Sequence, residues 1–470
     1  MCQSDSEHVP RPHPPETAKA LLAELIQQAC DAALTPAWSP PLALRVEVPI
    51  HSVGPLAWLR AQPAGRKTYW SGRENEFAMA GLGAADVLMA DDAADSPQML
   101  RKMRGVLSPA NPGMRYYGGV GFRPASCETP SWRVFGACQF IVPRFELCVR
   151  GGRHFLACNI VLWDSEPEAP PCDDILTELD GVCFPGDDGE PAVPAPLARQ
   201  DNPDQEGWVV KVKQALAAIS RGGAEKVVLA RESRFSFPSA FDPLALLARL
   251  TQEPDRSYHF CFQPSLSAAF IGASPFRLYL RINRYIQTEA VAGTRGRGRS
   301  AETDKELSDQ LMQSRKDLHD HRVVVSAVRD MLIALCRAVY VDASLNVLRL
   351  RHCQHLYCRI QGLLAHTDSD AALLEALHPT PVTCGHPVED AGRLIEDIEP
   401  FKRGWYGSPV GWIGYDGAEF AVATRAALAD GESLSLYSAA GLVYGANPQR
   451  EWDRAEDTIQ VFLRALSPTG

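Results

Sequence analysis

The sequence WIGYDGAEFAVATRAAL at residues 412–428, followed by LSLYSAAGLVYG at residues 434–445, decides the fold class of this chain. Asp416-Gly417 stands between two apolar runs, and this dipeptide in that setting indicates a tight β-hairpin. A further strand is expected over residues 434–445. Because strands joined by short turns pair in antiparallel fashion, this part of the chain predicts a mainly antiparallel sheet.

Strand and helix patterns alternate through the rest of the second half. Apolar runs predict strands, whereas apolar positions three and four residues apart, such as Val324, Val328 and Met331, predict helices. Strands are expected at residues 226–235, 268–282, 285–294 and 348–360. Helices are expected at residues 208–222 and 303–339 and after Asn447-Pro448. Many strands joined by hairpins, with helices between them, predict an α+β fold with mainly antiparallel sheets.

The chain divides into four segments. Residues 1–16, rich in Pro and His, are expected to form a disordered tail. Residues 17–183 alternate helical and strand patterns. Residues 184–206, rich in Pro, Gly and Asp, predict a long exposed loop, and residues 207–467 form the second half. A length of 470 residues, taken alone, predicts two or three domains.

The composition excludes several classes of partner. The chain has 47 Lys and Arg against 57 Asp and Glu, a formal charge of −10, and no basic run. A nucleic acid or an anionic lipid surface is therefore not expected as a partner. No apolar stretch reaches the roughly 18 residues of a membrane span, and residues 1–17 contain no hydrophobic signal core. We expect a cytoplasmic protein without a membrane partner, present as a monomer or a weak dimer.

Thirteen cysteines are scattered along the chain, and no Cys-x-x-Cys pair occurs. This spacing favours free thiols over disulfides or zinc ligands. The one dense cluster is His352, Cys353, His355 and Cys358. On the strand predicted there, Cys353 and His355 face one side while His352 and Cys358 face the other. A single tetrahedral zinc site is therefore not expected.

Two residues are candidates for acid–base chemistry. Lys226 opens an apolar strand, where a lysine usually marks the strand end with its amine in solvent. Inside a pocket, desolvation would favour the neutral amine, which can act as a base. Glu289 lies in the small apolar context TEAVAGT, which suits a general acid. The alternative for Glu289 is a structural ion pair with Arg295 or Arg297.

Three acidic residues and one arginine are candidates for binding. Asp317 and Asp320 are three residues apart and share one helix face, and Glu451 lies one turn into the last helix. Two facing helices with these carboxylates offer the oxygen ligands that Mg²⁺ prefers, although acidic residues on helices often form only a solvated face. Arg425, in an apolar strand context, is suited to a substrate carboxylate or to a structural acid.

Taken together, the segments from about residue 208 to 463 resemble the chorismate-utilising family, which includes the isochorismate, salicylate, anthranilate and aminodeoxychorismate synthases. Any one motif is weak, but nine stand in the family's order. They are KVVLAR (226–231), GASP (272–275), TEAVAGTRGRG (288–298), SRKDLHDH (314–321), QHL (354–356), LHPTP (377–381), RGWYGSPVGW (403–412), ATR (423–425), and AAGLV (439–443) followed by Pro-x-x-Glu (448–451).

The resemblance implies roles for the acid–base and metal candidates. Lys226 matches the lysine that deprotonates the water attacking C2 of chorismate. Glu289 matches the acid that protonates the departing C4 hydroxyl on the other face of the ring. Asp320 and Glu451 match carboxylates that ligate Mg²⁺, and Asp317 matches an acid that reaches the ion directly or through water.

The resemblance also implies a fold and a set of residues that line the substrate site, called the substrate wall below. Tyr406 and Arg425 match groups that hold the pyruvyl carboxylate of chorismate. The wall is completed by the further candidate substrate-binding residues Thr294, His378, Ala439 and Gly441. The implied architecture is one large domain with two stacked, mainly antiparallel sheets flanked by helices, to which residues 17–183 contribute the other half.

Two substitutions indicate the branch of the family. Lys226 stands where ammonia-using members tend to have Gln, so water is the expected nucleophile. Ala292 stands where aminodeoxychorismate synthases often have a Lys that forms a covalent intermediate. LHPTP (377–381) is similar to isochorismate synthases, whereas VTCGHP (382–387) partly resembles the salicylate branch, so an added pyruvate lyase activity is the alternative. A catalytically weakened member with a binding role is the third possibility.

The chain also departs from the family pattern. Asp320, Ala439, Thr458 and Phe276 replace a Glu, a Gly, a Lys and a Glu, respectively. Arg454 replaces a second glutamate three residues after Glu451, which places a positive charge beside the expected ion. Either Arg454 points into the site, or it turns outward to pair with Asp453 or Glu456.

Overall fold

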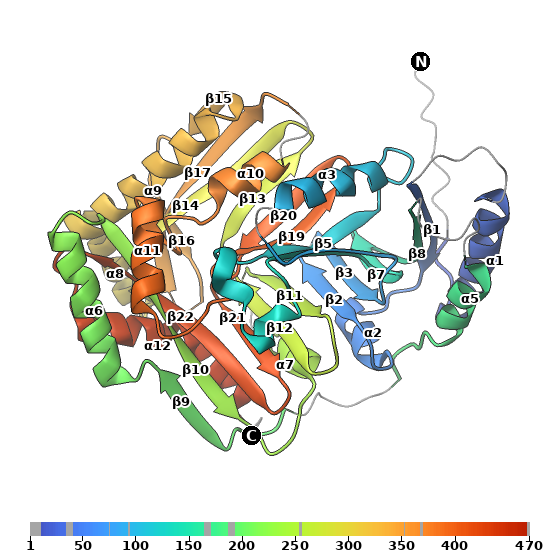
Figure 1. Ribbon diagram of the computed structural model, residues 1–470, viewed down its shortest axis with the longest axis horizontal. Coiled ribbons are helices and arrows are strands. Elements are labelled where there is room, and N and C mark those ends of the chain that lie inside the picture. Colours follow the sequence, from blue (N-terminus) through green and yellow to red (C-terminus); the bar gives the residue numbers. More distant parts are fainter. Residues whose placement is uncertain are drawn as a thin grey trace.

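The computed structural model describes residues 11–33, 41–74, 76–92, 95–163, 171–186, 193–252, 256–351, 353–366 and 370–467. Two large antiparallel sheets lie against each other, and helices cover their outer faces (Figure 1). The α+β class and the two stacked sheets expected from the sequence are confirmed. The expectation of several domains from length alone is wrong, because strands from both halves of the chain extend the same two sheets.

The first sheet has twelve strands, and Lys226 opens one of them. Along the sheet the order is β1 (Leu42–Ile50), β8 (Arg153–Leu162), β7 (Phe145–Arg150), β3 (Phe77–Leu82), β2 (Lys67–Ser71), β11 (Tyr258–Gln263), β12 (Ala268–Ser274), β21 (Ala426–Asp430), β22 (Ser433–Val443), β10 (Lys226–Ser236) and β18 (Gly385–His386), with β9 (Ala198–Asn202) also paired to β10.

The second sheet has ten strands and carries Glu289. Its order is β15 (Cys336–Val341), β17 (Cys353–Leu364), β14 (Tyr285–Gly296), β13 (Arg277–Ile282), β20 (Gly417–Val422), β19 (Pro409–Gly414), β5 (Arg115–Val120), β6 (Cys138–Val142) and β4 (Asp86–Ala90), with β16 (Asn346–Arg349) paired to β17. The predicted hairpin at Asp416-Gly417 is confirmed as the β19–β20 turn.

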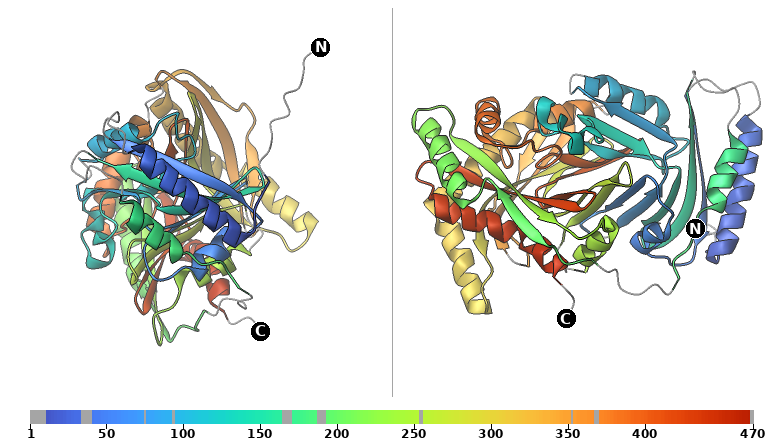
Figure 2. Two further views of the ribbon diagram at one scale, coloured as in Figure 1. Left: turned by 90° about the vertical axis from the view of Figure 1, so that its right-hand side faces the viewer. Right: turned by 60° about the horizontal axis from the view of Figure 1, so that its bottom comes forward.

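Apolar clusters hold these layers together. Between the sheets, Trp70 and Phe260 of the first sheet pack with Tyr117 and Ala421 of the second. Burial of such large side chains contributes roughly 1.5–3 kcal/mol each. The outer face of the twelve-stranded sheet packs against α1 (Pro15–Ala33), α2 (Pro55–Ala61), α5 (Cys172–Asp180), α7 (Pro243–Thr251) and α12 (Pro448–Leu466). Figure 2 shows α1 and α5 side by side at one end of the molecule.

The remaining helices cover the ten-stranded sheet and the start of β10. Helices α3 (Ser96–Val106), α9 (Arg315–Ile333) and α10 (Asp370–Leu377) pack on the outer face of the ten-stranded sheet. Helices α6 (Gln205–Ser220) and α11 (Val388–Ile398) pack beside the start of β10. Helix α8 (Ala301–Gln313) precedes α9, and the short α4 (Pro130–Arg133) follows a 3-10 turn at Pro124–Cys127. None of the described helices is long and apolar enough to cross a membrane.

Two segment boundaries differ from the sequence-based expectations. Helix α1 begins at Pro15 and His13 bridges to Ile50, so residues 11–16 are not a disordered tail, while residues 1–10 lie outside the described part. The loop expected at 184–206 contains β9, which pairs with β10; residues 187–192 of that loop lie outside the described residues. Residues 17–183 supply strands to both sheets, because the chain crosses between them after β3 and again after β6.

The helix expected at 303–339 is two helices followed by a strand. Ser314 ends α8 and caps α9, since its hydroxyl accepts a hydrogen bond from the Asp317 N–H. Helix α9 ends at Ile333, and the run CRAVYV forms β15. Likewise, the strand expected at 348–360 is the β16–β17 hairpin.

The cysteines in the part of the chain that the structure describes form no disulfides with one another. Cys353 and His355 share one side of β17, with Sγ 3.2 Å from Nε2, whereas His352 lies outside the described residues. Among the residues that the structure describes, no group of three or more His, Cys, Asp or Glu could hold a metal ion.

Candidate active site

Lys226 is a buried lysine held by a carboxylate. It pairs with Val443 of β22 and with His386 of β18, and its side chain is only 6% exposed. Its Nζ donates to Oδ1 of Asp320, on α9, at 2.7 Å. A Cβ at Gly441 would come within 3.3 Å of the Lys226 Cε, so the glycine leaves room for this side chain. The alternative of a strand-end lysine in solvent is therefore wrong.

Glu289 projects from β14 to the interior between the sheets. Its side chain is fully buried, and its partner is neither Arg295 nor Arg297. Instead, Nη1 of Arg73 donates to Oε2 at 2.9 Å, and Nη2 donates to Oε1. The hydroxyl of Tyr357 lies 3.5 Å from Oε1. Arg73 comes from the turn after β2, and nothing in its local sequence pointed to this contact.

A bulge in β14 explains why the sequence suggested the wrong arginine for Glu289. The register of β14 against β17 shifts between Ala292 and Thr294, and Gly293 has a φ of +74°. One extra residue in a strand reverses the face to which the following side chains point. Arg295 consequently donates to Asp317 on α9 at 2.7 Å instead of facing Glu289.

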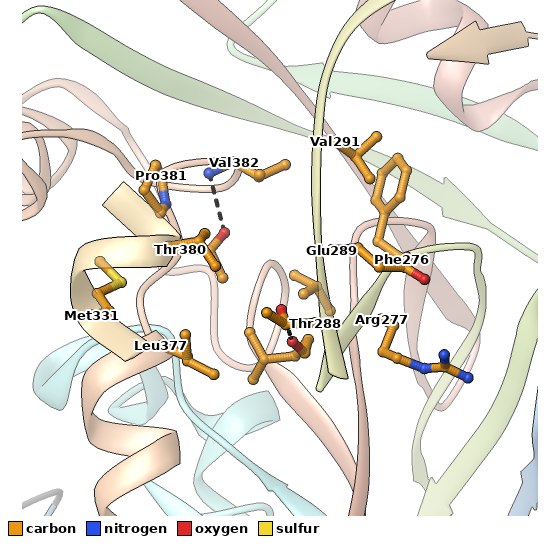
Figure 3. Close-up of a pocket in the computed structure, with 13 residues that line it drawn as sticks. Phe276, Arg277, Thr288, Glu289, Val291, Met331, Leu377, Thr380, Pro381 and Val382 are labelled. Carbon is orange, nitrogen blue, oxygen red and sulfur yellow. Dashed lines mark hydrogen bonds between the residues drawn. The ribbon is translucent and has the colours of Figure 1, made fainter. Parts of the chain in front are cut away.

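A cavity reaches Glu289 from the side of α9. In Figure 3, Met331 and Thr380 lie on one side of β14, whereas Phe276 and Arg277 lie on the other with Glu289. Most of its lining is apolar. It consists of Phe276, Arg277, Leu278, Thr288, Glu289, Val291, Val328, Met331, Leu377, Thr380, Pro381, Val382 and Val422.

The three candidate metal ligands each have a cationic partner. Besides the Asp317 and Asp320 contacts described above, Glu451 is buried and accepts from Arg454 Nη1 at 2.9 and 3.0 Å. Lys316 of α9 reaches Glu451 of α12 at 3.7 Å, so the two helices approach each other there. Arg454 pairs with Glu451, the candidate ligand, and not with Asp453 or Glu456.

The two acids expected to pair with an outward-pointing Arg454 have other partners. Glu456 pairs with Arg199 and Arg231, and Asp453 accepts from Gln449.

These carboxylates suit a hard divalent cation in their chemistry. Mg²⁺ is commonly bound through one or two carboxylates, with water and substrate oxygens completing its shell. Asp320 and Glu451 supply two such groups, and Asp317 a third nearby on α9. Each would exchange its lysine or arginine partner for the ion. The chemistry of these carboxylates therefore suits magnesium, but within the described part of the chain they do not form a group of three that could hold an ion.

Arg425 and Thr294 meet at one short stretch of β17. Arg425, in the turn between β20 and β21, has Nη2 3.3 Å from the sulfur of Cys353. Thr294 Oγ1 lies 3.0 Å from Nδ1 of His355, whose ring packs edge-on against Phe276. The structure thus brings together the arginine and the threonine that the sequence assigned to the substrate wall.

Tyr406 and Ala439 pack together in the core cluster between the sheets. The Tyr406 ring stacks on Tyr437 with centroids 5.2 Å apart, and burial raises the pKa of its hydroxyl above the ordinary value. Ala439 pairs with Ala230 on β10. Both therefore lie beside the strand that begins with Lys226.

His378 contacts a different part of the chain. Its Nε2 lies 3.0 Å from the Gly121 carbonyl, and its ring packs edge-on against Phe122. Burial lowers the pKa of this imidazole to about 4, so it is neutral at pH 7. The residues that follow it, Thr380 to Val382, line the cavity, while the substrate-binding role of His378 itself stays a prediction.

His321 is a buried residue that the sequence analysis did not single out. It follows Asp320 on α9, and its Nε2 lies 3.3 Å from the carbonyl of Ala290, the residue after Glu289. Burial lowers the pKa of its imidazole. His321 therefore fixes α9 against β14 between the Lys226–Asp320 pair and Glu289.

Comparisons with known proteins agree with this geometry. The family described as chorismate binding enzyme matches residues 28–467. Isochorismate synthase 2, chloroplastic, from Arabidopsis thaliana is 33% identical over 453 residues, which cover 90% of this chain and 80% of that protein. Isochorismate synthase MenF from Bacillus subtilis is 28% identical over 437 residues, covering 89% and 92%. The solved structure of MenF, the menaquinone-specific isochorismate synthase from Escherichia coli, has a TM-score of 0.82 and 25% identity, covering 96% of this chain and 100% of that one.

Proposed function

The chain belongs to the family of chorismate binding enzymes, and on this premise we propose that it is an isochorismate synthase. The reaction adds water at C2 of chorismate and removes the C4 hydroxyl, so it needs one base and one acid on opposite faces of the ring. Lys226 and Glu289 come from opposing sheets and are both buried. This observation carries the proposal, and the names of the most similar relatives support it.

Each of the two residues has a defined task. Lys226 takes a proton from the water that attacks C2, a role that requires its amine to be released from the ion pair with Asp320. Glu289, as the carboxylic acid, gives a proton to the oxygen leaving C4, which departs as water. A positioned acid or base typically contributes a factor of roughly 10²–10⁴ to the rate. Arg425, Tyr406 and Thr294 are proposed to hold the substrate so that C2 faces Lys226.

Magnesium is part of the proposal as the cofactor. Asp320 and Glu451 would hold the ion, with Asp317 as a direct or water-mediated third ligand. When bound, the ion supplies positive charge against a carboxylate of the substrate. Asp320 connects metal binding with proton transfer, because the carboxylate that is proposed to hold the ion accepts a hydrogen bond from Lys226, the proposed base.

Several finer points remain predictions. The product would feed salicylate, siderophore or menaquinone-type biosynthesis, and a further pyruvate elimination to salicylate is the alternative activity, favoured only by VTCGHP at 382–387. A catalytically weakened protein with a binding role is the remaining alternative, motivated by Arg454. The cytoplasmic location and a monomeric or weakly dimeric state are expectations from sequence.

Incubation of the purified protein with chorismate and Mg²⁺, followed by chromatography and mass spectrometry, tests the proposal. Isochorismate is the expected product. Salicylate together with pyruvate would establish the lyase alternative, and unchanged chorismate would contradict the proposed function. Lys213→Gln, which alters an exposed lysine on α6, is the matched control for Lys226→Gln: the first should keep full activity.

A further inference from the structure

Arg73 is the cation that faces Glu289, and it comes from the N-terminal half of the chain. Its side chain is 10% exposed, and its two terminal nitrogens each donate to one carboxylate oxygen. Nη1 also donates to the Pro275 carbonyl at 3.0 Å, so the guanidinium is anchored beside the GASP motif. A two-armed arginine–carboxylate contact fixes orientation as well as charge.

The other groups around Glu289 do not replace Arg73. Arg277 is nearby, but its Nε donates to the Tyr258 hydroxyl at 2.8 Å and its Nη2 to Glu419 at 3.1 Å. Tyr258 in turn donates to Glu419 and lies under the Arg73 guanidinium. Of the residues that the structure describes, Arg73 and Tyr357 contact Glu289, and Tyr258 and Arg277 are the further titratable groups near it.

The pair has a direct chemical consequence for an acid catalyst. Once Glu289 has given its proton to the departing oxygen, a buried carboxylate remains, which is costly without a partner. The two terminal nitrogens of Arg73 already contact the carboxyl group of Glu289 that becomes this carboxylate. Burial opposes the charge on Arg73, but Glu289 more than offsets this and raises the pKa of the guanidinium. Arg73 is therefore charged whenever Glu289 ionises.

We propose that Arg73 is a positioning residue for Glu289, which orients this acid and stabilises the carboxylate left after proton transfer. This inference rests on the proposed function. It also gives the N-terminal half of the chain a part in the site, because Arg73 lies on the turn between β2 and β3, far in sequence from the motif region.

Three variants test the role by kinetics. Arg73→Gln removes the charge, Arg73→Lys keeps it without the fork, and Arg60→Gln is the control, since Arg60 makes a half-exposed pair with Asp242 in the same half of the chain. For Arg73→Gln we expect kcat to fall roughly 10- to 100-fold, within the range of acid catalysis, with KM changed less than about threefold. Arg73→Lys should recover part of kcat.

The split between kcat and KM separates positioning from a merely structural role. A variant that is only less stable keeps the wild-type kcat once the rate is normalised to folded protein well below the melting temperature. Loss of positioning instead lowers kcat of the folded protein, and Arg73→Lys recovers part of it.

A measurement without turnover keeps this inference distinct from the proposed function. Carboxyl ¹³C NMR of glutamate-labelled protein at one fixed pH, with the Glu289 signal assigned by Glu289→Gln, compares the environment of this carboxyl group in the wild type, in Arg73→Gln and in Arg60→Gln. A change of the Glu289 chemical shift in Arg73→Gln, absent in Arg60→Gln, supports the pairing even if no chorismate is consumed. If Arg73→Gln only lowers the melting temperature and leaves kcat and the Glu289 signal unchanged, the proposal is wrong.

Discussion

Replacement of Arg454 tests the point at which the chain departs most from its family's metal site. Its Nη1 contacts both oxygens of Glu451, the proposed ligand on α12. A divalent ion bound by Glu451 must displace this guanidinium or share the carboxylate with it. We therefore expect both Arg454→Met and Arg454→Glu to tighten Mg²⁺ binding.

The size of the effect follows from distance and exposure. An ion bound to Glu451 would lie on the order of 5 Å from a guanidinium at its present place, where charges of +2 and +1 repel by about 2–3 kcal/mol at an effective dielectric of 40–80. The Arg454 side chain is 40% exposed and can swing into solvent, which reduces the effect. We expect about 1–2 kcal/mol for Arg454→Met, a 5- to 30-fold tighter dissociation constant. Arg454→Glu adds a ligand and should exceed this.

Calorimetric titration of Mg²⁺ into each protein, with and without chorismate, measures the effect directly. Arg450→Met is the matched control, because it removes one positive charge from an exposed position four residues earlier on the same helix. That control should change the dissociation constant less than about twofold. Equal affinity in the wild type and in both Arg454 variants, or weaker binding in Arg454→Glu, would refute the assignment of Glu451 as the ligand.

The remaining predictions concern the base, the ion and the substrate wall. Lys226→Gln should lower kcat by about 10²- to 10⁴-fold while chorismate still binds, and a near-wild-type rate would exclude Lys226 as the base. EDTA should abolish product formation and excess Mg²⁺ should restore it; full activity in EDTA would rule out the magnesium requirement. Arg425→Ala should raise KM by an amount equivalent to about 2–5 kcal/mol if the arginine pairs with a desolvated carboxylate, whereas an unchanged KM would assign Arg425 a structural role.

The fold could be predicted where local chemistry determines it. Asp416-Gly417 gave the β19–β20 hairpin, and Asn447-Pro448 gave the start of α12, where Asn447 accepts from the Arg450 N–H. The break at Ser314 was missed because apolar spacing continues across it while a single hydroxyl starts a new helix. β9 was missed because its sequence, ARQDN, is polar, and its backbone pairing with β10 supplies what its side chains do not.

The site could be predicted only where residues belong to motifs. Lys226, Asp320 and Glu289 lie in such motifs, and the structure buries Lys226 and Glu289 with charged partners. The charged partners of these residues could not be predicted from the sequence. Arg73 is 216 residues from Glu289, and no local pattern joins them. The two partners suggested for Glu289 by proximity, Arg295 and Arg297, are wrong. The bulge at Gly293 turns Arg295 to the other face of β14, and Arg297 donates to Asp304.

The three candidate metal ligands are paired with cations of the chain itself. Each candidate ligand pairs with at least one cation: Asp317 with Arg295, Asp320 with Lys226, and Glu451 with both Arg454 and Lys316. This is expected, because a buried carboxylate without a partner is strongly destabilising. Under the proposed function, Mg²⁺ would displace these cations from the carboxylates. The ion and the dianionic substrate together add no net charge, so we expect each to bind more tightly when the other is present.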